Sequence, residues 1–350
     1  MITVNARSIA GPGEAFTPMS LQRRAVGRTD VLIDIAYCGI CHTDVSRARG
    51  EFGQTHYPLV PGHEIVGIVS SVGSEVRKFA VGDRVGVGCL VDSCRECDYC
   101  RDGMEPYCRN GHIRTYNCLD RSGQYTQGGY SEKIVVDESY VLRIPDGIPL
   151  ESAAPLLCAG ITLYSPLRHW KAGPGVEVAI IGYGGLGHVG VPISAALGAH
   201  TTVFDLTMDK KADAYRRGAD DYRLSTDPAI FTDFAGTFDL ILSTVPGDLD
   251  YDAFLGLLAL DGTFVNLGVP KKRISLDVFS LLNNRRSLAG TLVGSIEETQ
   301  EMLEFCAGNG ITAEVEVVGA DGIDAAYDGV AAGEVRYRYV IDIATMATTG

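Results

Sequence analysis

Residues 176–205 read VEVAIIGYGGLGHVGVPISAALGAHTTVFD, and this stretch decides the fold of the second half of the chain. Its first apolar run is typical of a buried strand, and the G-x-G-x-x-G that follows opens a helical segment. A second apolar run then places Asp205 at the end of a second strand. This order is typical of a βαβ unit that binds a dinucleotide, because the glycines let the backbone approach a pyrophosphate and the helix N-terminus supplies N–H donors. The glycines expected to line the cofactor are Gly182, Gly184, Gly185 and Gly187.

Asp205 also bears on which cofactor binds. A carboxylate at this strand end accepts hydrogen bonds from the adenosine ribose and repels a 2′-phosphate, so the sequence predicts NAD(H) rather than NADP(H). Lys210 and Lys211 leave the opposite choice open, since either side chain can turn toward a phosphate. Lys210 is as readily explained as a donor to a ribose hydroxyl.

The surrounding sequence divides the chain into two regions with different secondary-structure patterns. From about residue 152, apolar strands alternate with helical segments, among them residues 210–219 and 251–262, which predicts a parallel sheet covered by helices. Between about residues 30 and 145, short β-like runs are separated by Gly, Pro and Asp turns, which predicts a β-barrel-like domain. The fold class is therefore α/β, with a barrel-like domain and a doubly wound parallel sheet.

Composition limits the classes of function. A chain of 350 residues favours two domains, and its net charge of −14 disfavours binding to nucleic acid or to an anionic membrane. The N-terminus lacks a basic segment followed by an apolar run, and no apolar stretch reaches the roughly 20 residues of a membrane span. We therefore expect a cytoplasmic protein that acts on a small molecule.

Residues 89–108 contain a C-x2-C-x2-C-x7-C pattern. In a reducing compartment such spacing predicts a metal site more often than disulfides. An iron–sulfur cluster or inert thiols are the alternatives, but tetrahedral zinc fits four cysteines in one short loop. Four thiolates leave no position for a substrate, so this zinc is expected to be structural. Its predicted ligands are Cys94, Cys97, Cys100 and Cys108.

Three further residues stand in suggestive contexts: Cys41 in CGICHTD, His63 in PGHE and Cys158 in LLCAGIT. By residue type alone, they are at least as compatible with ordinary core positions as with a metal site.

Taken in order, CGICHTD, PGHE, the cysteine loop, LLCAGIT and GYGGLG resemble the zinc-dependent medium-chain alcohol dehydrogenases, most closely the cinnamyl alcohol dehydrogenase branch. The likeness spans nearly the whole chain. It implies a GroES-like catalytic domain, residues 1–152 and 293–350, that carries the zinc loop 89–108. It also implies a Rossmann domain, residues 153–292, and a homodimer.

The resemblance implies a second, catalytic zinc held by Cys41, His63 and Cys158, so that each chain binds two Zn(II) ions. Glu64 would be an alternating or supporting ligand, and Asp44 would accept the second ring proton of His63. Three protein ligands leave a fourth position for a substrate oxygen. The implied reaction interconverts primary aromatic, allylic or medium-chain alcohols and aldehydes by hydride transfer with a nicotinamide cofactor.

The same resemblance implies a proton relay that begins at the hydroxyl of Thr43 and ends three residues later. Ser46 stands where the family has histidine, so water or His56 would have to complete the relay.

Other roles are carried over position by position. His42 would contact the pyrophosphate, Thr162 and Leu186 the nicotinamide, and Arg338 the phosphates. The implied substrate pocket consists of Phe52, Leu90, Tyr116 and Leu292. Phe52 replaces the tryptophan usual in this branch, and Asp205 replaces its serine.

Two other functions remain open from the sequence. A conjugate (1,4) reductase of an enal is one, because some relatives that lost relay groups reduce the alkene. A zinc-stabilised binding protein without catalysis is the other, although all three implied catalytic ligands are present.

Overall fold

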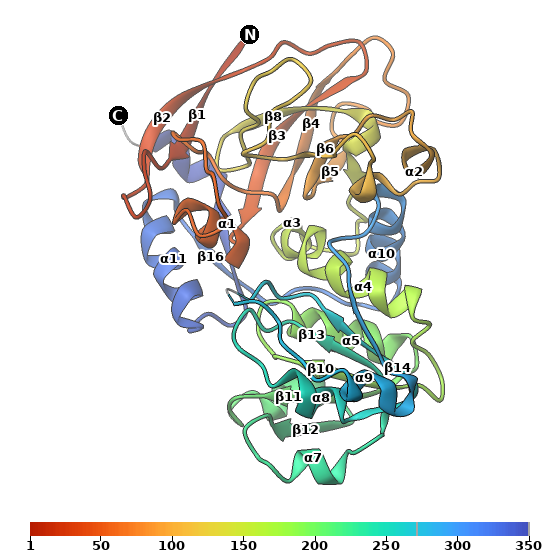
Figure 1. Ribbon diagram of the computed structural model, residues 1–350. Coiled ribbons are helices and arrows are strands. Elements are labelled where there is room, and N and C mark those ends of the chain that lie inside the picture. The colour runs from red at the N-terminus through yellow and green to blue at the C-terminus, as the bar shows by residue number, and fades with distance from the viewer. Residues whose placement is uncertain (271, 349–350) are drawn as a thin grey trace. The chain divides into compact units, whose positions relative to one another are not determined.

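The computed structural model describes residues 1–270 and 272–348 and contains two compact units (Figure 1). One unit, here called the catalytic unit, runs from Met1 to Cys158 and resumes at Gly294. The other, the nucleotide unit, is the continuous segment Ala159–Val293. The second unit is thus inserted into the first along the chain.

The catalytic unit is built on a sheet with the order β16-β17-β3-β4-β5-β9. Its central strand, β3, pairs with β8 through its first half and with β17 through its last residues, so the sheet curves around this strand. Hairpin β1–β2 and the short pair β6–β7 stand beside it. The strands are β1 (Ile2–Ser8), β2 (Thr17–Arg23), β3 (Asp30–Gly39), β4 (Ile65–Val72), β5 (Arg84–Val87), β6 (Leu90–Asp92), β7 (Ile113–Arg114), β8 (Lys133–Asp137), β9 (Leu142–Arg143), β16 (Val315–Val318) and β17 (Arg338–Asp342).

Short helices close this unit. Its α-helices are α1 (His42–Ala48), α2 (Asp98–Arg101), α3 (Leu150–Ala153), α10 (Ile296–Gly308) and α11 (Ile323–Ala332). Its 3-10 helices are η1 (Glu105–Tyr107), η2 (Glu138–Tyr140), η3 (Ala154–Leu157), η5 (Ala320–Gly322) and η6 (Ile343–Thr348).

The core of the catalytic unit follows the alternation along β3. Val31, Ile33 and Ile35 are buried on one face, as period-two patterning requires. At Gly67 of β4 a Cβ would overlap the backbone of Asp34, so the two strands approach more closely than a side chain permits.

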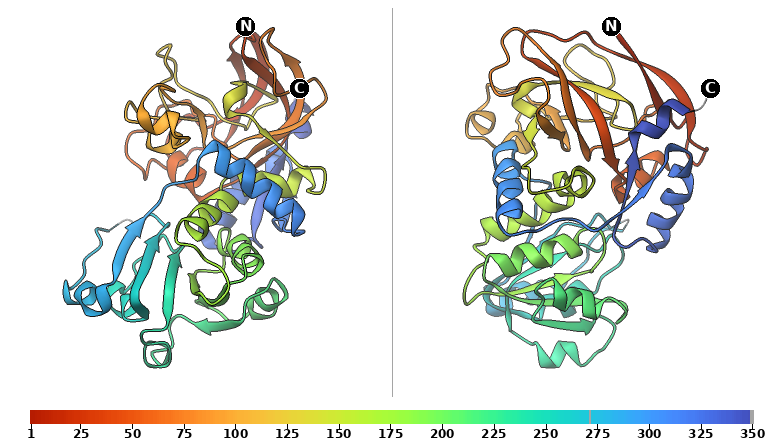
Figure 2. Two further views of the ribbon diagram at one scale, coloured as in Figure 1. Left: turned by 90° about the vertical axis from the view of Figure 1, so that its right-hand side faces the viewer. Right: turned by 180° about the vertical axis from the view of Figure 1, so that it is seen from behind.

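The nucleotide unit is a parallel sheet with the order β12-β11-β10-β13-β14-β15. Numbered within the unit, this is the order 3-2-1-4-5-6 of a Rossmann fold. Helices lie on both faces of the sheet, with α5 against β10 and β11 and α8 against β14 (Figure 2). The strands are β10 (Glu177–Ile181), β11 (His200–Asp205), β12 (Asp221–Leu224), β13 (Phe238–Ser243), β14 (Leu258–Asn266) and β15 (Ser287–Gly290). The helices are α4 (Ala159–His169), α5 (Gly187–Ala196), α6 (Lys211–Arg216), α7 (Ile230–Asp233), α8 (Tyr251–Leu255), α9 (Phe279–Leu282) and η4 (Asn283–Arg285).

One predicted element of the nucleotide unit is wrong. Residues 251–262 were expected to be helical throughout, but the helix ends at Leu255 and β14 begins at Leu258. A left-handed residue, Asp261 with φ 64°, lies inside this strand near a register shift against β13. Apolar residues are so dense over this segment that a helical period and a strand period fit it equally well. Among the described residues, no helix is long and apolar enough to cross a bilayer.

Candidate active site

Four buried side chains with metal-binding atoms meet in the catalytic unit. Cys41 is the N-cap of α1, His63 and Glu64 immediately precede β4, and Cys158 follows η3. Their ligand atoms all lie within 4.8 Å of one another. Turns and helix ends carry all four residues, which lets segments from distant parts of the sequence converge.

The spacing of these atoms fits a tetrahedral metal ion. The Sγ atoms of Cys41 and Cys158 are 3.8 Å apart, and His63 Nε2 is 3.2 Å from Cys158 Sγ. Two thiolates that each stand about 2.3 Å from a tetrahedral zinc are separated by about 3.8 Å. The donor set of two sulfurs and one imidazole nitrogen also suits zinc.

Asp44 organises this cluster while itself fully buried. Its Oδ1 atom lies 3.0 Å from His63 Nδ1, and its Oδ2 atom accepts a hydrogen bond from the backbone N–H of Cys41 at 2.8 Å. The second contact is part of the capping box of α1. One carboxylate therefore fixes both the helix start that carries Cys41 and the orientation of the His63 ring.

Glu64 faces the same cluster without a directed hydrogen bond. Both of its oxygens are buried and lack a hydrogen-bond partner, although Arg338 Nη2 forms an ion pair with Oε1 at 3.2 Å. Burial raises the pKa of Glu64 to about 8, and the charge of Arg338 opposes this rise. A buried carboxyl group that has no hydrogen-bond partner and lies beside the other donor atoms can serve as an intermittent metal ligand. Arg338, expected at the cofactor phosphates, is itself buried and contacts this glutamate.

Helix α1 carries the residues of the implied relay. Thr43 is exposed and Ser46 is buried. The Ser46 hydroxyl donates to Glu51 Oε2 at 3.0 Å, a partner that sequence reasoning missed because no motif marks it. His56 does not point to Ser46 but stacks on Tyr125, with ring centroids 3.8 Å apart. The geometry thus associates Ser46 with Glu51 rather than with His56.

The residues of the implied substrate pocket fall in different places. Tyr116 is buried, with its ring 5.9 Å from the His63 ring, and Leu90 is also buried. Phe52 is half-buried beneath the guanidinium of Arg47. Leu292 belongs to the other unit and is exposed.

The second cysteine cluster is formed by the loop around α2 and η1. The sulfurs of Cys94, Cys97, Cys100 and Cys108 lie within 4.8 Å of one another. Backbone N–H groups point at several of these sulfurs, including that of Cys97, which donates to Cys94 Sγ at 3.3 Å. Such N–H donors lower the pKa of Cys94 to about 6, which favours the thiolate that zinc requires. The loop fits a closed four-sulfur site.

Ser93 connects this loop to the rest of the unit. Its hydroxyl oxygen is fully buried, accepts a hydrogen bond from Tyr140 at 2.6 Å and lies 3.2 Å from Cys100 Sγ. The loop is therefore anchored to η2 directly behind one of its sulfurs.

The glycine motif in the nucleotide unit has the geometry of a phosphate cradle. Gly182 has φ 94°, and a Cβ there would lie 2.5 Å from Thr244 Oγ1. A Cβ at Gly187 would collide with the carbonyl oxygen of Gly182. At Gly184, by contrast, a Cβ would meet no protein atom within 4 Å. Glycine there keeps the backbone approachable to a ligand, and α5 begins at Gly187 with its N–H groups toward the same loop.

Asp205, at the end of β11, is held by protein groups. Its Oδ2 atom accepts a hydrogen bond from the Tyr222 hydroxyl at 3.0 Å and lies 3.4 Å from Lys210 Nζ. Its Oδ1 atom is 3.4 Å from the backbone N–H of Tyr183. Lys211 lies over the ring of Tyr215. Asp205 and Lys210 thus lie together at the end of β11 and contact each other.

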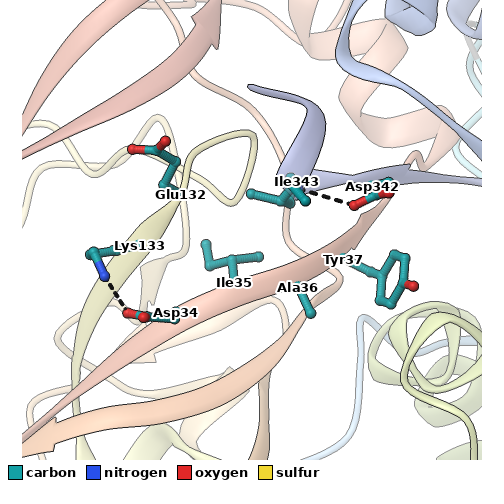
Figure 3. A pocket seen from close by; sticks show the side chains of 9 residues that line it. Asp34, Ile35, Ala36, Tyr37, Glu132, Lys133, Asp342 and Ile343 are labelled. Atoms are coloured by element: carbon teal, nitrogen blue, oxygen red, sulfur yellow. Dashed lines mark hydrogen bonds and ion pairs between the residues drawn. The ribbon is translucent and has the colours of Figure 1, made fainter. Parts of the chain in front are cut away.

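A separate cavity of about 600 Å³ lies beside β3 and β17 (Figure 3). Its charged lining residues pair within the protein, for example Lys133 Nζ with Asp34 Oδ1 at 2.5 Å. It shares no residue with either cysteine cluster and is not the candidate active site.

Comparisons with known proteins agree with this geometry. Residues 27–146 match the alcohol dehydrogenase GroES-like domain, and residues 185–308 match the zinc-binding dehydrogenase family. NADP-dependent alcohol dehydrogenase C 1 of Mycolicibacterium smegmatis is 54% identical over 347 residues, which cover 99% of each chain.

Two solved structures are also similar. A cinnamyl alcohol dehydrogenase from Sorghum bicolor superposes with a TM-score of 0.96 at 39% identity and covers 100% of both chains. The CAD from Helicobacter pylori, complexed with NADP(H), superposes with a TM-score of 0.92 at 40% identity over 98% of this chain and 99% of that one.

These findings contradict the NAD(H) preference predicted from Asp205. The M. smegmatis relative is named NADP-dependent, and the H. pylori protein was solved with NADP(H). The physical reason lies in the contacts of the carboxylate. Tyr222 and Lys210 engage its Oδ2 atom, and the ammonium group of Lys210 partly neutralises the charge that would repel a 2′-phosphate.

Proposed function

Since this chain belongs to the zinc-dependent medium-chain alcohol dehydrogenase family and acts on alcohols and aldehydes, we propose that it interconverts primary aromatic, allylic or medium-chain alcohols and aldehydes with NADP(H). The observation that carries this proposal is the buried cluster of Cys41, His63 and Cys158, with Asp44 behind the histidine. A second zinc on the four-cysteine loop would be structural.

The donor set determines what the first site can do. Cys41, His63 and Cys158 would hold a zinc ion, which would supply Lewis-acid chemistry at a substrate oxygen, and NADP(H) would supply or accept the hydride. Asp44 holds His63 with Nδ1 toward its carboxylate, which leaves Nε2 as the donor atom toward the cluster. The buried Glu64 carboxyl group, which contacts Arg338, lies among the same donor atoms and could serve as a further ligand in its ionised form. Tyr116 and Leu90 are buried, and the Tyr116 ring lies near the His63 ring, so they would supply apolar surface beside the site.

A shortened proton path accompanies this site. Thr43 and Ser46 are three residues apart on α1, and such positions are neighbours on a helix surface. The Ser46 hydroxyl is bonded to the exposed Glu51, whose carboxylate can pass a proton to solvent. We infer that Ser46 and Glu51 together replace the histidine that ends the family relay.

The relay predicts a pH-dependent defect. Glu51→Gln keeps a hydrogen-bond acceptor for Ser46 but removes the proton acceptor, and Ser46→Ala removes the hydroxyl. Each variant should slow alcohol oxidation near neutral pH by about tenfold, below the roughly 10²–10⁴ of a full acid–base catalyst because water can stand in. The deficit should shrink as the pH rises, because hydroxide then removes the proton. Stopped-flow or steady-state rates between pH 6 and about 10 test this. If the pH–rate profiles of the variants parallel that of the wild type, water alone accepts the proton.

NADP(H) is supported by the groups around the end of β11. Lys210, the N-cap residue of α6, lies beside Asp205 with its side chain only 19% exposed, so an ammonium group is held at the place where the adenosine ribose would bind. A 2′-phosphate carries nearly two negative charges and gains from this ammonium group.

The proposed function makes a direct prediction. With an aldehyde panel that includes benzaldehyde and an enal, kcat/KM for NADPH should exceed that for NADH by at least about tenfold, and the enal should yield the allylic alcohol. Lys210→Ala should lower this ratio about tenfold, mainly through KM for NADPH, because it removes a charge-assisted contact. Lys272→Ala, which removes an exposed lysine of the same unit paired with Asp248, is the control. A saturated aldehyde as the product of the enal would indicate conjugate reduction instead.

We also propose a homodimer. Val278, Phe279 and Leu282 are each more than half exposed around α9, next to the edge strand β15. Exposed apolar side chains beside an unprotected strand edge are typical of a surface that a second copy covers. Sedimentation should show a particle of two chains, and a monomer at assay concentration would contradict this.

A further inference from the structure

Tyr222, in β12, has its hydroxyl between the end of β11 and the loop that follows. The hydroxyl lies 3.0 Å from Asp205 Oδ2 and 2.8 Å from the carbonyl oxygen of Thr207. One phenol therefore contacts both the strand-end carboxylate and the loop that leads to Lys210. No motif in the sequence pointed to this residue, which lies 17 positions beyond Asp205.

The position of this hydroxyl is fixed from several sides. Parallel pairing of β12 with β11 sets Tyr222 opposite Val203, and its side chain is fully buried. The ring meets the equally buried ring of Tyr183 edge to face, with centroids 6.2 Å apart and planes at 77°. Tyr183 is tethered in turn, because its hydroxyl donates to Asp213 Oδ2 at 2.9 Å. The Tyr222 ring consequently has little freedom to withdraw its hydroxyl from Asp205.

Held in this way, the carboxylate has one of its two oxygens, Oδ2, already engaged by protein groups. Its side chain is 11% exposed, and Oδ2 is shared between Tyr222 and Lys210. A carboxylate at this strand end recognises NAD(H) by accepting a hydrogen bond from the ribose 2′-hydroxyl. We propose that Tyr222 is a positioning residue that sets cofactor choice by holding Asp205 away from the ribose, so that a 2′-phosphate meets Lys210 instead. This inference rests on the proposed NADP(H) preference.

The test is Tyr222→Phe, which removes one oxygen and keeps the ring in the core. Freed from the phenol, Asp205 can turn toward the ribose. The NADPH/NADH ratio of kcat/KM should therefore fall about tenfold, which corresponds to about 1.4 kcal/mol. The dissociation constants of NADPH and NADH, measured by fluorescence titration without substrate, should move in the same sense. NADH binding should tighten.

Tyr183→Phe is the matched control. It removes a phenol oxygen from the same buried ring pair, but that oxygen binds Asp213 and not Asp205. Whatever this variant does to kcat or to thermal stability, it should lower the cofactor ratio much less than Tyr222→Phe does, because the Tyr222 hydroxyl itself stays beside Asp205. A ratio that falls equally in both variants would show a general loosening of this core and would overturn the proposal.

A double-mutant cycle separates the path through Asp205 from any other. In an Asp205→Ser background there is no carboxylate to release, so adding Tyr222→Phe should leave the ratio unchanged. If the tyrosine substitution lowers the ratio as much in this background as in the wild type, Tyr222 does not act through Asp205. A wild-type enzyme that prefers NADH would instead refute the proposed function. An enzyme that prefers NADPH but does not respond to Tyr222→Phe would refute only this inference.

Discussion

Cys158→Ala should abolish turnover and leave the protein folded. The thiol is one of three donors in the buried cluster, 3.8 Å from Cys41 Sγ and 3.2 Å from His63 Nε2. Without it the site would retain too few ligands to hold zinc firmly, and Lewis-acid stabilisation is worth several kcal/mol. We expect kcat to fall by at least about 10³-fold, equivalent to about 4 kcal/mol. Zinc content should drop from two ions to one per chain.

The control for Cys158→Ala is Cys306→Ala. Cys306 is fully buried in α10 and contacts Met302, so its removal also costs a buried thiol, but it belongs to neither cysteine cluster. This variant should keep two zinc ions and near-normal kcat. Should a well-folded Cys158→Ala protein keep both full zinc content and wild-type kcat, the catalytic site has been assigned to the wrong residues.

Cys100→Ser should destabilise the catalytic unit without removing the catalytic donors. Zinc bound to a loop contributes folding free energy directly, because the site does not exist in the unfolded chain. The loop has only the short elements α2 and η1 to order it, so we expect a loss of about 3 kcal/mol, at the upper end of what single substitutions usually cost. At about 2–4 °C per kcal/mol, the melting temperature should fall by about 6–12 °C. Residues 94–108 should also become cleavable by protease.

Cys118→Ser is the comparison for Cys100→Ser. Cys118 is half-buried and lies outside the four-sulfur group. It should change neither the zinc content nor the melting temperature by a comparable amount. An unchanged melting temperature for Cys100→Ser, with two zinc ions still bound per chain, would contradict a structural zinc on this loop.

The sequence predicted features that depend on residue type and spacing. Gly182 and Gly187 could be assigned from the motif alone, because their conformation and close contacts exclude any side chain. The four-cysteine loop could also be predicted from the sequence, since metal ligands in one short loop are constrained by chain geometry. By contrast, Cys41 and Cys158 required the family resemblance, because nothing in their local sequence distinguishes a ligand from a buried thiol.

Other features depended on where side chains point. Asp205 lies at a strand end, as predicted. Its carboxylate is hydrogen-bonded to Tyr222, which lies on the neighbouring strand, and the sequence gives no sign of this contact. The hydrogen bond from Ser46 to Glu51 could not be predicted from the sequence, because no motif marks Glu51. The boundary between α8 and β14 was predicted wrongly for a third reason: a dense apolar run fits the period of a helix and that of a strand equally well. Tertiary context decided each of these cases.

The inserted arrangement of the chain has a consequence for synthesis on the ribosome. The nucleotide unit is a continuous segment and is complete as soon as Val293 has emerged. The catalytic unit then still lacks β17, the strand that pairs with the end of β3, and with it Arg338, the counter-charge of Glu64. Since domains generally fold as units, the catalytic unit can complete its fold only when the segment from Gly294 onward has joined the first 158 residues. A ribosome that stalls before residue 338 would thus hold a finished nucleotide unit beside an unfinished zinc centre.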